Sequence, residues 1–273
     1  VGSEMCIRDS DYTAGGVRMN GRKFFFFDID GTLTTPLTND YPDSTKEAIK
    51  ELQDNGHFVA IATGRMQADA WEVAKALGIC AAVSDGGNAL TIHGELIYDE
   101  GLPLEDCIRT LSEIDSERFP FAVCPENKKM RVATSDLYLS RVKYRYYETV
   151  VDPSFDFRKV DTIHKIFVAC TKDDLPEIPL HTLPHVWFRK DNMLIEPVHK
   201  ERGIFEVMKR YNLSDEDVVV FGDGMNDRSM FRDEWFSIAM GNAKPQLKEK
   251  AKYITKRADD DGIYYACKKF GWI

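Results

Sequence analysis

The sequence predicts an α/β fold in which a Rossmann-like, doubly wound parallel sheet is interrupted by an inserted α+β domain. Three observations lead to this prediction. Both ends of the chain alternate short apolar strands with amphipathic helices, the pattern of a parallel sheet with right-handed crossovers. The middle of the chain lacks this alternation over about 100 residues, the size of a small domain. Acidic and glycine-containing motifs follow three of the predicted strands, where open parallel sheets bind ligands.

The N-terminal part supplies the first strands and helices of the sheet. Residues 24–28 form an apolar run that ends in an acid, as expected of a buried parallel strand. Ser44 and Glu47 form a capping-box pattern at the start of a helix, which Gly56 ends. The elements expected here are strands at 24–28, 58–62 and 80–83 and helices at 44–55 and 67–77.

The C-terminal part resumes the same alternation of strands and helices. We expect strands at 218–221, 236–240 and 253–255, and helices at 203–211, 225–231, 245–252 and 262–270. Residues 19–87 and 191–273 are therefore predicted to form one discontinuous core.

The middle segment, residues 88–190, is predicted to be the inserted α+β domain. It begins with a hairpin at 89–98 that turns at His93-Gly94. The other elements expected here are helices at 104–115 and 137–147 and strands at 121–124, 130–134, 163–170 and 186–190.

Composition and charge exclude several classes of protein. The 273 residues are 43% hydrophobic and 30% charged, values typical of a globular chain rather than a disordered one. The net charge of −9 argues against a general nucleic-acid binder, which needs a basic face. No apolar run approaches the roughly 20 residues that span a bilayer, so we expect no membrane partner either. The sequence does not indicate an oligomeric state.

The first residues of the chain have a separate interpretation. Residues 1–10, VGSEMCIRDS, show no hydrophobic period and no signal-peptide core. They resemble the translation of a sequencing-library adapter, so Met19 is the expected natural start and residues 1–18 are expected to lie outside the fold. The alternative is a disordered natural N-terminus.

The cysteines beyond residue 10 indicate free thiols. They are scattered, odd in number and show no CxxC spacing, so neither a disulfide framework nor a zinc site is expected. Small buried thiols in a reducing cytosol fit this pattern, and the predicted location is cytoplasmic. The five cysteines are Cys80, Cys107, Cys124, Cys170 and Cys267.

The strongest local motif is Asp28-Ile29-Asp30-Gly31-Thr32, directly after the first predicted strand. The carboxylates of Asp28 and Asp30 would repel each other if both were unpaired at this strand end, and a divalent cation would relieve the repulsion. Gly31 allows a sharp turn. The alternative interpretation is a solvated acidic turn.

Two weaker signals follow in the chain. Thr63-Gly64-Arg65 comes after the second predicted strand, where a hydroxyl and free backbone N–H groups suit a phosphate oxygen. The same pattern also fits a simple helix cap. Lys200 precedes an amphipathic helix, and taken alone it would be a solvated surface residue.

A fourth motif, GDGMND, follows the predicted strand at 218–221 and contains Asp223, Asn226 and Asp227. Alone it also fits a glycine-rich turn with a capping aspartate. The order of acid pair, Thr-Gly, lysine and acid cluster is far more specific than any one part.

Together these motifs resemble the four motifs of the haloacid dehalogenase (HAD)-like hydrolases, most closely the Cof-type phosphatases, and the insert resembles their IIB-type cap. The resemblance covers about Lys23 to Lys269 and is loose over the insert. The sequence HKERG around Lys200 departs mildly from the family pattern, because a glycine commonly follows the lysine there.

The resemblance implies that the chain is an enzyme, a phosphoric monoester hydrolase that acts through an aspartyl-phosphate. Asp28 would be the nucleophile. Asp30 would be the general acid and base, first protonating the leaving alcohol and then activating water. An acid at this position favours phosphate esters over halides, because a halide leaving group needs no proton.

The resemblance also implies a cofactor and a phosphate site. Mg²⁺ would bind Asp28, the Asp30 carbonyl and Asp223, with Asp227 as an additional acid or one placed behind the ligands. The residues expected to hold or orient the phosphoryl group are Thr63, Gly64, Arg65, Lys200 and Asn226.

The predicted function is Mg²⁺-dependent hydrolysis of small phosphorylated metabolites, with sugar phosphates as one class. The alternatives are a phosphotransferase or phosphomutase of the same superfamily and a non-catalytic regulator that binds metabolites. Cap residues that could contact substrate are Lys128, Arg131, Arg189 and Lys190, although each is more typical of a solvated surface charge. His164 is expected to be structural.

Overall fold

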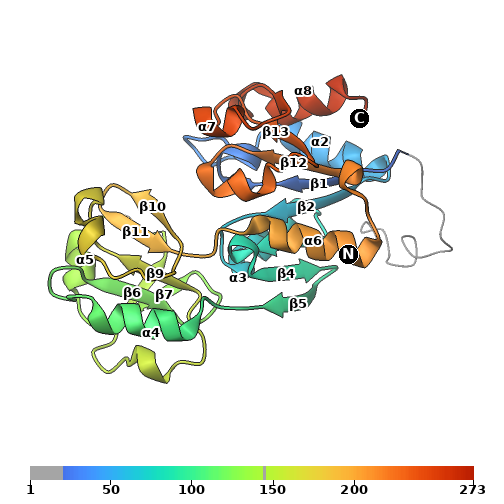
Figure 1. The fold of residues 1–273 in the computed structure, drawn as a ribbon. Coiled ribbons are helices and arrows are strands. Elements are labelled where there is room, and N and C mark those ends of the chain that lie inside the picture. The colour runs from blue at the N-terminus through green and yellow to red at the C-terminus, as the bar shows by residue number, and fades with distance from the viewer. Residues whose placement is uncertain (1–20, 144–145) are drawn as a thin grey trace.

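Two sheets organise the protein, and each belongs to its own lobe (Figure 1). The computed structural model describes residues 21–143 and 146–273. The prediction for residues 1–18 therefore falls outside the described residues. None of the described helices has the length and apolar character needed to cross a membrane.

The first sheet has eight strands, and its six consecutive members from β14 to β3 run parallel. This arrangement confirms the predicted α/β fold class, because parallel neighbours joined through helices are the doubly wound pattern. In spatial order the strands are β14 (Tyr253–Ile254), β13 (Phe236–Ala239), β12 (Val218–Gly222), β1 (Phe24–Phe27), β2 (Phe58–Ala62), β3 (Ala81–Ser84), β4 (Ala89–Ile92) and β5 (Glu95–Asp99).

Helices cover both faces of this sheet. Alternate side chains of β1 explain why: Phe24 and Phe26 enter one core cluster, and Phe25 and Phe27 enter the other. The helices are α2 (Asp43–Asp54), α3 (Gln67–Ala76) and α8 (Gly262–Lys269) on the face of Phe25, and α6 (Lys200–Tyr211) and α7 (Pro245–Lys248) on the face of Phe24.

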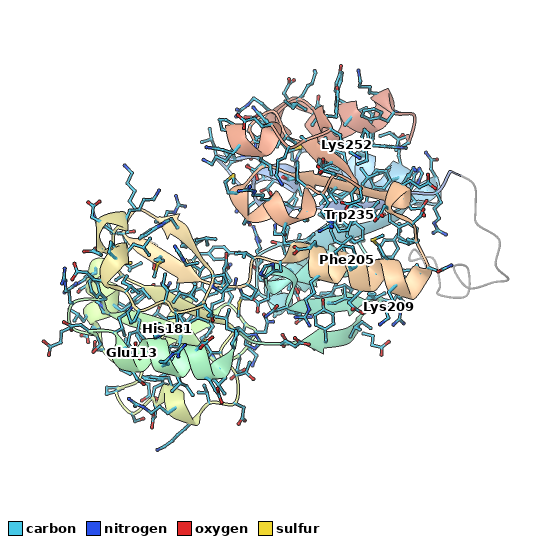
Figure 2. The ribbon with its side chains drawn as sticks, viewed as in Figure 1. Glu113, His181, Phe205, Lys209, Trp235 and Lys252 are labelled. Carbon is cyan, nitrogen blue, oxygen red and sulfur yellow. The ribbon has the colours of Figure 1, made fainter. Side chains whose placement is uncertain are left out.

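The second sheet has six strands and is antiparallel except between β7 and β8. Its strands, in spatial order, are β10 (His185–Arg189), β11 (Asn192–Ile195), β9 (Lys165–Val168), β6 (Phe121–Cys124), β7 (Met130–Ala133) and β8 (Glu148–Val151). The helices of this lobe are α4 (Leu104–Glu113) and α5 (Leu137–Arg141). Figure 2 labels Glu113 and His181, which pair at 2.8 Å and join α4 to the loop before β10.

Short helical turns connect many of these elements. They are η1 (Ile29–Leu33), η2 (Asp85–Gly87), η3 (Phe157–Lys159), η4 (Lys172–Glu177), η5 (Asp215–Asp217), η6 (Met225–Met230) and η7 (Ala258–Asp260). Of these, η1 follows β1 and η6 follows β12, so they carry parts of the first and fourth motifs singled out in the sequence.

The chain changes sheets at points that differ from the predicted limits of 88 and 190. The hairpin of β4 and β5 pairs with β3 and extends the first sheet, and β11 pairs with β9 and β10 in the second. The sheets therefore divide the chain after Asp99 and after Ile195. The pairing of a strand depends on the tertiary structure, and the β4–β5 hairpin and β11 are both short enough to join either sheet.

Two local predictions are also corrected. The helix expected at 137–147 ends at Arg141, and β8 follows because its β-branched residues pair with β7. The capping box of Ser44 and Glu47 does not form, since the helix already begins at Asp43 and the Ser44 hydroxyl is buried without a partner.

Candidate active site

The site lies at the carboxyl ends of three adjacent parallel strands. Asp28 follows β1, Thr63 follows β2, and Asp223 follows β12, and β1 pairs with both of the other strands. Parallel strands end at the same edge of a sheet, so residues far apart in the chain meet there. Lys200 joins them from the first turn of α6.

Lys200 is the cation at the centre of the site. Its side chain is 1% exposed, and its Nζ donates to Asp28 Oδ1 at 2.7 Å and to Asp227 Oδ1 at 2.6 Å. Burial lowers the pKa of Lys200, but the neighbouring Asp227 and Asp28 more than offset this and hold the pKa above its usual range. The surface interpretation of this lysine is therefore wrong, and the residue is a buried ammonium.

Three carboxylates surround this single ammonium. Asp28, Asp223 and Asp227 each offer an oxygen, and these oxygens all lie within 4.8 Å of one another. Burial, reinforced by Asp227, raises the pKa of Asp223 to about 7 and that of Asp28 well above its ordinary value. When all three carboxylates are ionised, the ammonium of Lys200 leaves an excess of negative charge, so a further cation would stabilise the cluster.

Asp227 also holds the backbone of its own loop. Its Oδ2 accepts the N–H groups of Asp223 and Gly224, both at 2.9 Å, while Lys200 takes Oδ1. Both oxygens are thus already engaged by the protein. This geometry favours Asp227 as the acid behind the ligands, one of the two roles expected for it.

Asp30 lies apart from the buried cluster. Its side chain is 53% exposed. The Arg65 guanidinium donates two hydrogen bonds to it, from Nε to Oδ2 at 2.9 Å and from Nη2 to Oδ1 at 2.6 Å. Arg65 was expected on the phosphate, and the structure shows two of its nitrogens bound to Asp30. This bidentate pair fixes the orientation of the carboxylate at the mouth of the site.

The Thr63-Gly64 turn lies beside this pair. Thr63 Oγ1 accepts the Arg65 N–H at 3.1 Å within the turn, but α3 begins only at Gln67 with Met66 as its N-cap, so this oxygen is not a helix cap. The hydroxyl proton of Thr63 is still a donor available to a ligand. A methyl group at Gly64 would lie 4.0 Å from the Asn226 amide nitrogen, which places Asn226 across from this turn.

Gly31 is required by a close approach inside the site. Its φ of +86° favours glycine, and a Cβ there would lie 2.5 Å from Asp223 Oδ2. The turn after β1 can therefore pack directly on the carboxylate that follows β12.

Asn242 is a site residue that the sequence analysis did not select. Its Nδ2 donates to the Gly31 carbonyl at 2.7 Å and to Asp223 Oδ2 at 3.3 Å, and its Oδ1 accepts the Ala258 N–H at 2.9 Å. The signal was available, because Asn242 follows the predicted strand at 236–240, which ends at the same sheet edge.

Tyr146 is the second missed residue, and it reaches the site from the other lobe. Its hydroxyl donates to Asp69 at 2.5 Å, and the Arg65 guanidinium lies 5.7 Å from its ring centre. Placing 137–147 in one helix concealed this contact, because the loop after α5 carries the tyrosine.

Three of the four basic cap candidates are exposed, and the fourth is buried. Lys128 is exposed and pairs with Glu126, and Arg189 and Lys190 are exposed. Arg131 is 1% exposed, with its guanidinium 4.6 Å from the Phe167 ring centre, so it is a core residue of the second sheet rather than a surface charge. His164 is buried against Asp85 at 3.2 Å, consistent with the structural role expected for it.

Comparisons with known proteins agree with this architecture. A family model described as haloacid dehalogenase-like hydrolase matches residues 25–267. The protein named "Putative phosphatase YkrA" from Bacillus subtilis (strain 168) is 33% identical over 266 residues, covering 92% of this chain and 98% of its own length. The 5-amino-6-(5-phospho-D-ribitylamino)uracil phosphatase YcsE of the same strain is 26% identical, covering 92% and 96%.

Solved structures show the same likeness over the whole fold. A hypothetical protein from Geobacillus kaustophilus HTA426 superposes with a TM-score of 0.79 at 30% identity, covering 93% of this chain and 100% of its own. The HAD subclass IIB sugar phosphatase BT4131 superposes with a TM-score of 0.76 at 26% identity, covering 92% and 100%. With the motif order and the strand-end site, these matches confirm the predicted resemblance: the chain belongs to the haloacid dehalogenase-like hydrolases, and it is an enzyme of that family.

Proposed function

We propose that the protein is a Mg²⁺-dependent phosphatase that hydrolyses small phosphorylated metabolites through an aspartyl-phosphate on Asp28. The observation that carries this proposal is the group formed by the buried Asp28 and Lys200 and the half-buried Asp223 beside the Thr63-Gly64 turn. It combines a nucleophilic carboxylate with donors and positive charge for phosphoryl oxygens, and phosphoryl transfer depends mainly on such positioning.

The proposed reaction has two steps. In the first, an Asp28 oxygen attacks phosphorus, the bond from phosphorus to the alcohol oxygen breaks, and Asp30 gives that oxygen a proton. In the second, Asp30 takes a proton from water, the resulting hydroxide attacks phosphorus, and the bond to Asp28 breaks. Phosphate leaves and both carboxyl groups return to their starting states. Lys200 favours the ionised form of Asp28, opposing the effect of burial on its pKa, and would neutralise charge on the phosphoryl group.

The acidic cluster fits a magnesium ion. Its donors are carboxylate oxygens, the ligands that Mg²⁺ prefers, and three carboxylates share the ammonium of Lys200. The residues that would hold the ion are Asp28, Asp223 and the Asp30 carbonyl, with Asp227 behind them. When bound, the ion supplies charge neutralisation for the phosphoryl oxygens.

The substrate class is inferred from the relatives and the cellular location from the cysteines. The relatives named above include a sugar phosphatase and a phosphatase of a ribityl phosphate, so a phosphorylated polyol or sugar is the proposed class. The five cysteines in the described part of the chain are buried and free, which supports a reducing, cytoplasmic location.

The test is phosphate release from a panel of phosphorylated metabolites by the purified protein with Mg²⁺. We expect release from at least one sugar or polyol phosphate, and a loss of at least about a thousandfold in Asp28→Asn. Asp43→Asn is the matched control, because this aspartate is fully exposed on α2 and should leave the rate unchanged. Equal rates in Asp28→Asn and the parent would refute the mechanism.

The same assay separates the alternatives. A phosphomutase would interconvert isomeric sugar phosphates in the presence of a bisphosphate without releasing phosphate. A non-catalytic regulator would bind a metabolite and turn over none of the panel. Either result would replace the phosphatase proposal.

A further inference from the structure

A second buried lysine, Lys165, lies next to the Thr63-Gly64 turn but comes from the other sheet. It is carried by β9, its side chain is 1% exposed, and its Nζ donates to the Gly64 carbonyl oxygen at 2.6 Å. The same Nζ hydrogen-bonds the Glu196 carboxylate and lies 3.3 Å from Asp85 Oδ1. One ammonium from the six-stranded sheet thus holds a backbone atom of the proposed phosphate-binding turn.

The charges around Lys165 are built to keep it protonated. Burial lowers its pKa, but Glu196 and Asp85 outweigh this effect and hold the pKa above its usual value. A buried ammonium needs such compensation, since an unpaired buried charge is strongly destabilising. Lys165 therefore stays a hydrogen-bond donor at every physiological pH.

Further backbone contacts hold the same turn from the side of η2. The Asp85 N–H donates to the Arg65 carbonyl at 2.7 Å, and the Gly86 N–H donates to the Thr63 carbonyl at 3.1 Å. Together with Lys165, these contacts engage the three consecutive carbonyls of Thr63, Gly64 and Arg65. Of the three donors, only the one to Gly64 is a side chain, and only that one belongs to the second sheet.

The network also reaches the segment that leads to Lys200. Glu196 directly follows β11, and the His199 N–H donates to the Gly86 carbonyl at 2.8 Å. A Cβ at Gly86 would lie 1.9 Å from the Pro197 carbonyl oxygen, so this segment packs tightly on η2. The phosphate-binding turn, the return crossing between sheets and the start of α6 are therefore fixed by one set of contacts.

We propose that Lys165 is a positioning residue for phosphate binding, which couples the placement of the second sheet to the backbone of the Thr63-Gly64 turn. This inference rests on the proposed function, because it assumes that the turn contacts phosphoryl oxygens. With the Gly64 carbonyl held, the hydroxyl of Thr63 and the free N–H groups of the turn keep one arrangement toward the ligand. Without this bond the turn relaxes, and phosphate binds more weakly.

The test compares two variants of the intact protein. E196Q removes the carboxylate partner but keeps the ammonium and its bond to Gly64, and K165M/E196Q removes the donor as well. Calorimetric titration with inorganic phosphate in Mg²⁺ measures the dissociation constant without requiring turnover. We expect E196Q to remain within about threefold of the parent and K165M/E196Q to bind about tenfold more weakly, the scale of one charge-assisted hydrogen bond. KM for a hydrolysed ester should rise in parallel.

A purely structural role predicts a different outcome. Both variants would then melt at lower temperature, yet folded molecules of both would bind phosphate equally, and that equality would overturn the inference. K165L/E196L offers a second, apolar packing should K165M/E196Q not fold. If neither folded, Lys165 would be a folding requirement and the inference would also fail.

The outcome can be told apart from failure of the proposed function. Ester hydrolysis by the parent, combined with equal phosphate affinity in the two variants, overturns only the inference about Lys165. A parent that neither hydrolyses esters nor binds phosphate overturns both. Weaker binding in K165M/E196Q supports the inference even where the physiological ester is not in the panel.

Discussion

At the scale of single residues, the site is organised by an imbalance of buried charge. The Lys200 ammonium donates hydrogen bonds to two carboxylates, and the Asp223 carboxyl lies beside them with its pKa raised to about 7. Breaking a buried pair leaves an uncompensated charge, so these residues cannot be exchanged one at a time without cost. Asp30 differs from them because it is half exposed and held by Arg65. In the proposed mechanism, the buried Asp28 would attack phosphorus and the exposed Asp30 would exchange protons with solvent.

This difference predicts how Asp30→Asn will behave. Alkyl phosphates need a proton on the leaving oxygen, so their hydrolysis should fall at least about a hundredfold. With p-nitrophenyl phosphate, whose leaving group needs no proton, the first step should survive and the second should slow. Rapid-mixing measurements should show a burst of about one nitrophenolate per enzyme. Equal loss on both substrates, with no burst, would contradict the role of Asp30.

The cysteines lead to a second prediction at this scale. Burial raises the pKa of Cys107, Cys124 and Cys267 to about 12 in each case. At pH 8, below these values, about one thiol in ten thousand is then the reactive thiolate. We expect alkylation by iodoacetamide to be at least about a hundredfold slower in the native protein than in guanidinium chloride, measured peptide by peptide by mass spectrometry. Fast native labelling of these peptides would show that they are accessible.

At the scale of elements, close approach explains residues that propensity does not. Gly203 lies inside α6, where glycine is unfavourable, yet a Cβ there would lie 2.4 Å from Val83 Cγ1 on β3. The absence of this one carbon lets α6 pack on the sheet. Figure 2 labels Phe205 on the same helix beside Trp235, with ring centres 5.0 Å apart. The start of α6, and with it Lys200, is held by these contacts.

The expected result for Gly203→Ala is a loss of about 1–3 kcal/mol of unfolding free energy, because overpacking outweighs the gain in helix propensity of about 1 kcal/mol. Denaturant titration measures it. Adding Val83→Ala should recover part of the loss, since the clash is removed, whereas Val83→Ala alone should destabilise. A stabilised Gly203→Ala would show that the helix and strand can separate freely.

For some strands, the hydrophobic pattern of the sequence was sufficient to predict where they begin and end. Continuous apolar runs placed β1, β2 and β12 to within a residue, because a strand buried on both faces cannot be read as a surface segment. Other strands were not found from their own pattern. β8 and β11 are defined by their pairing with neighbouring strands, β8 with β7 and β11 with β9.

At the scale of the whole molecule, the two lobes meet through polar contacts as well as through the chain crossings. Asn127 of the second lobe accepts the Gln67 N–H at 2.6 Å and donates to Asp99 at 2.5 Å. The contact to Gln67 falls in the segment from Gly64 to Asp69, and so do those of Lys165 with Gly64 and Tyr146 with Asp69. Several residues of the second lobe therefore contact the segment that continues from the Thr63-Gly64 turn.

Metal binding should be visible in the stability of the whole molecule. A ligand that binds only the folded state stabilises it by about 2.7 kcal/mol at one hundred times its dissociation constant. For a chain of this size we expect a rise in Tm of about 5 °C with Mg²⁺. Asp223→Asn should abolish the rise, and Asp43→Asn, on the exposed surface of α2, should keep it. A rise of equal size in Asp223→Asn would move the ion away from the acidic cluster.

The sequence by itself determined the doubly wound core, the order of the motifs, and the place of each motif at the end of a strand or near the start of a helix. These features depend on local patterns and on the rule that parallel strands end at the same edge of a sheet. It could not determine which partners those side chains choose. Only the tertiary structure decided three of these pairings. Lys200 is buried between Asp28 and Asp227, Arg65 binds Asp30, and Lys165 reaches Gly64 from the other sheet. The physical reason is that burial and pairing of charge depend on neighbours distant in the chain, which no local pattern specifies.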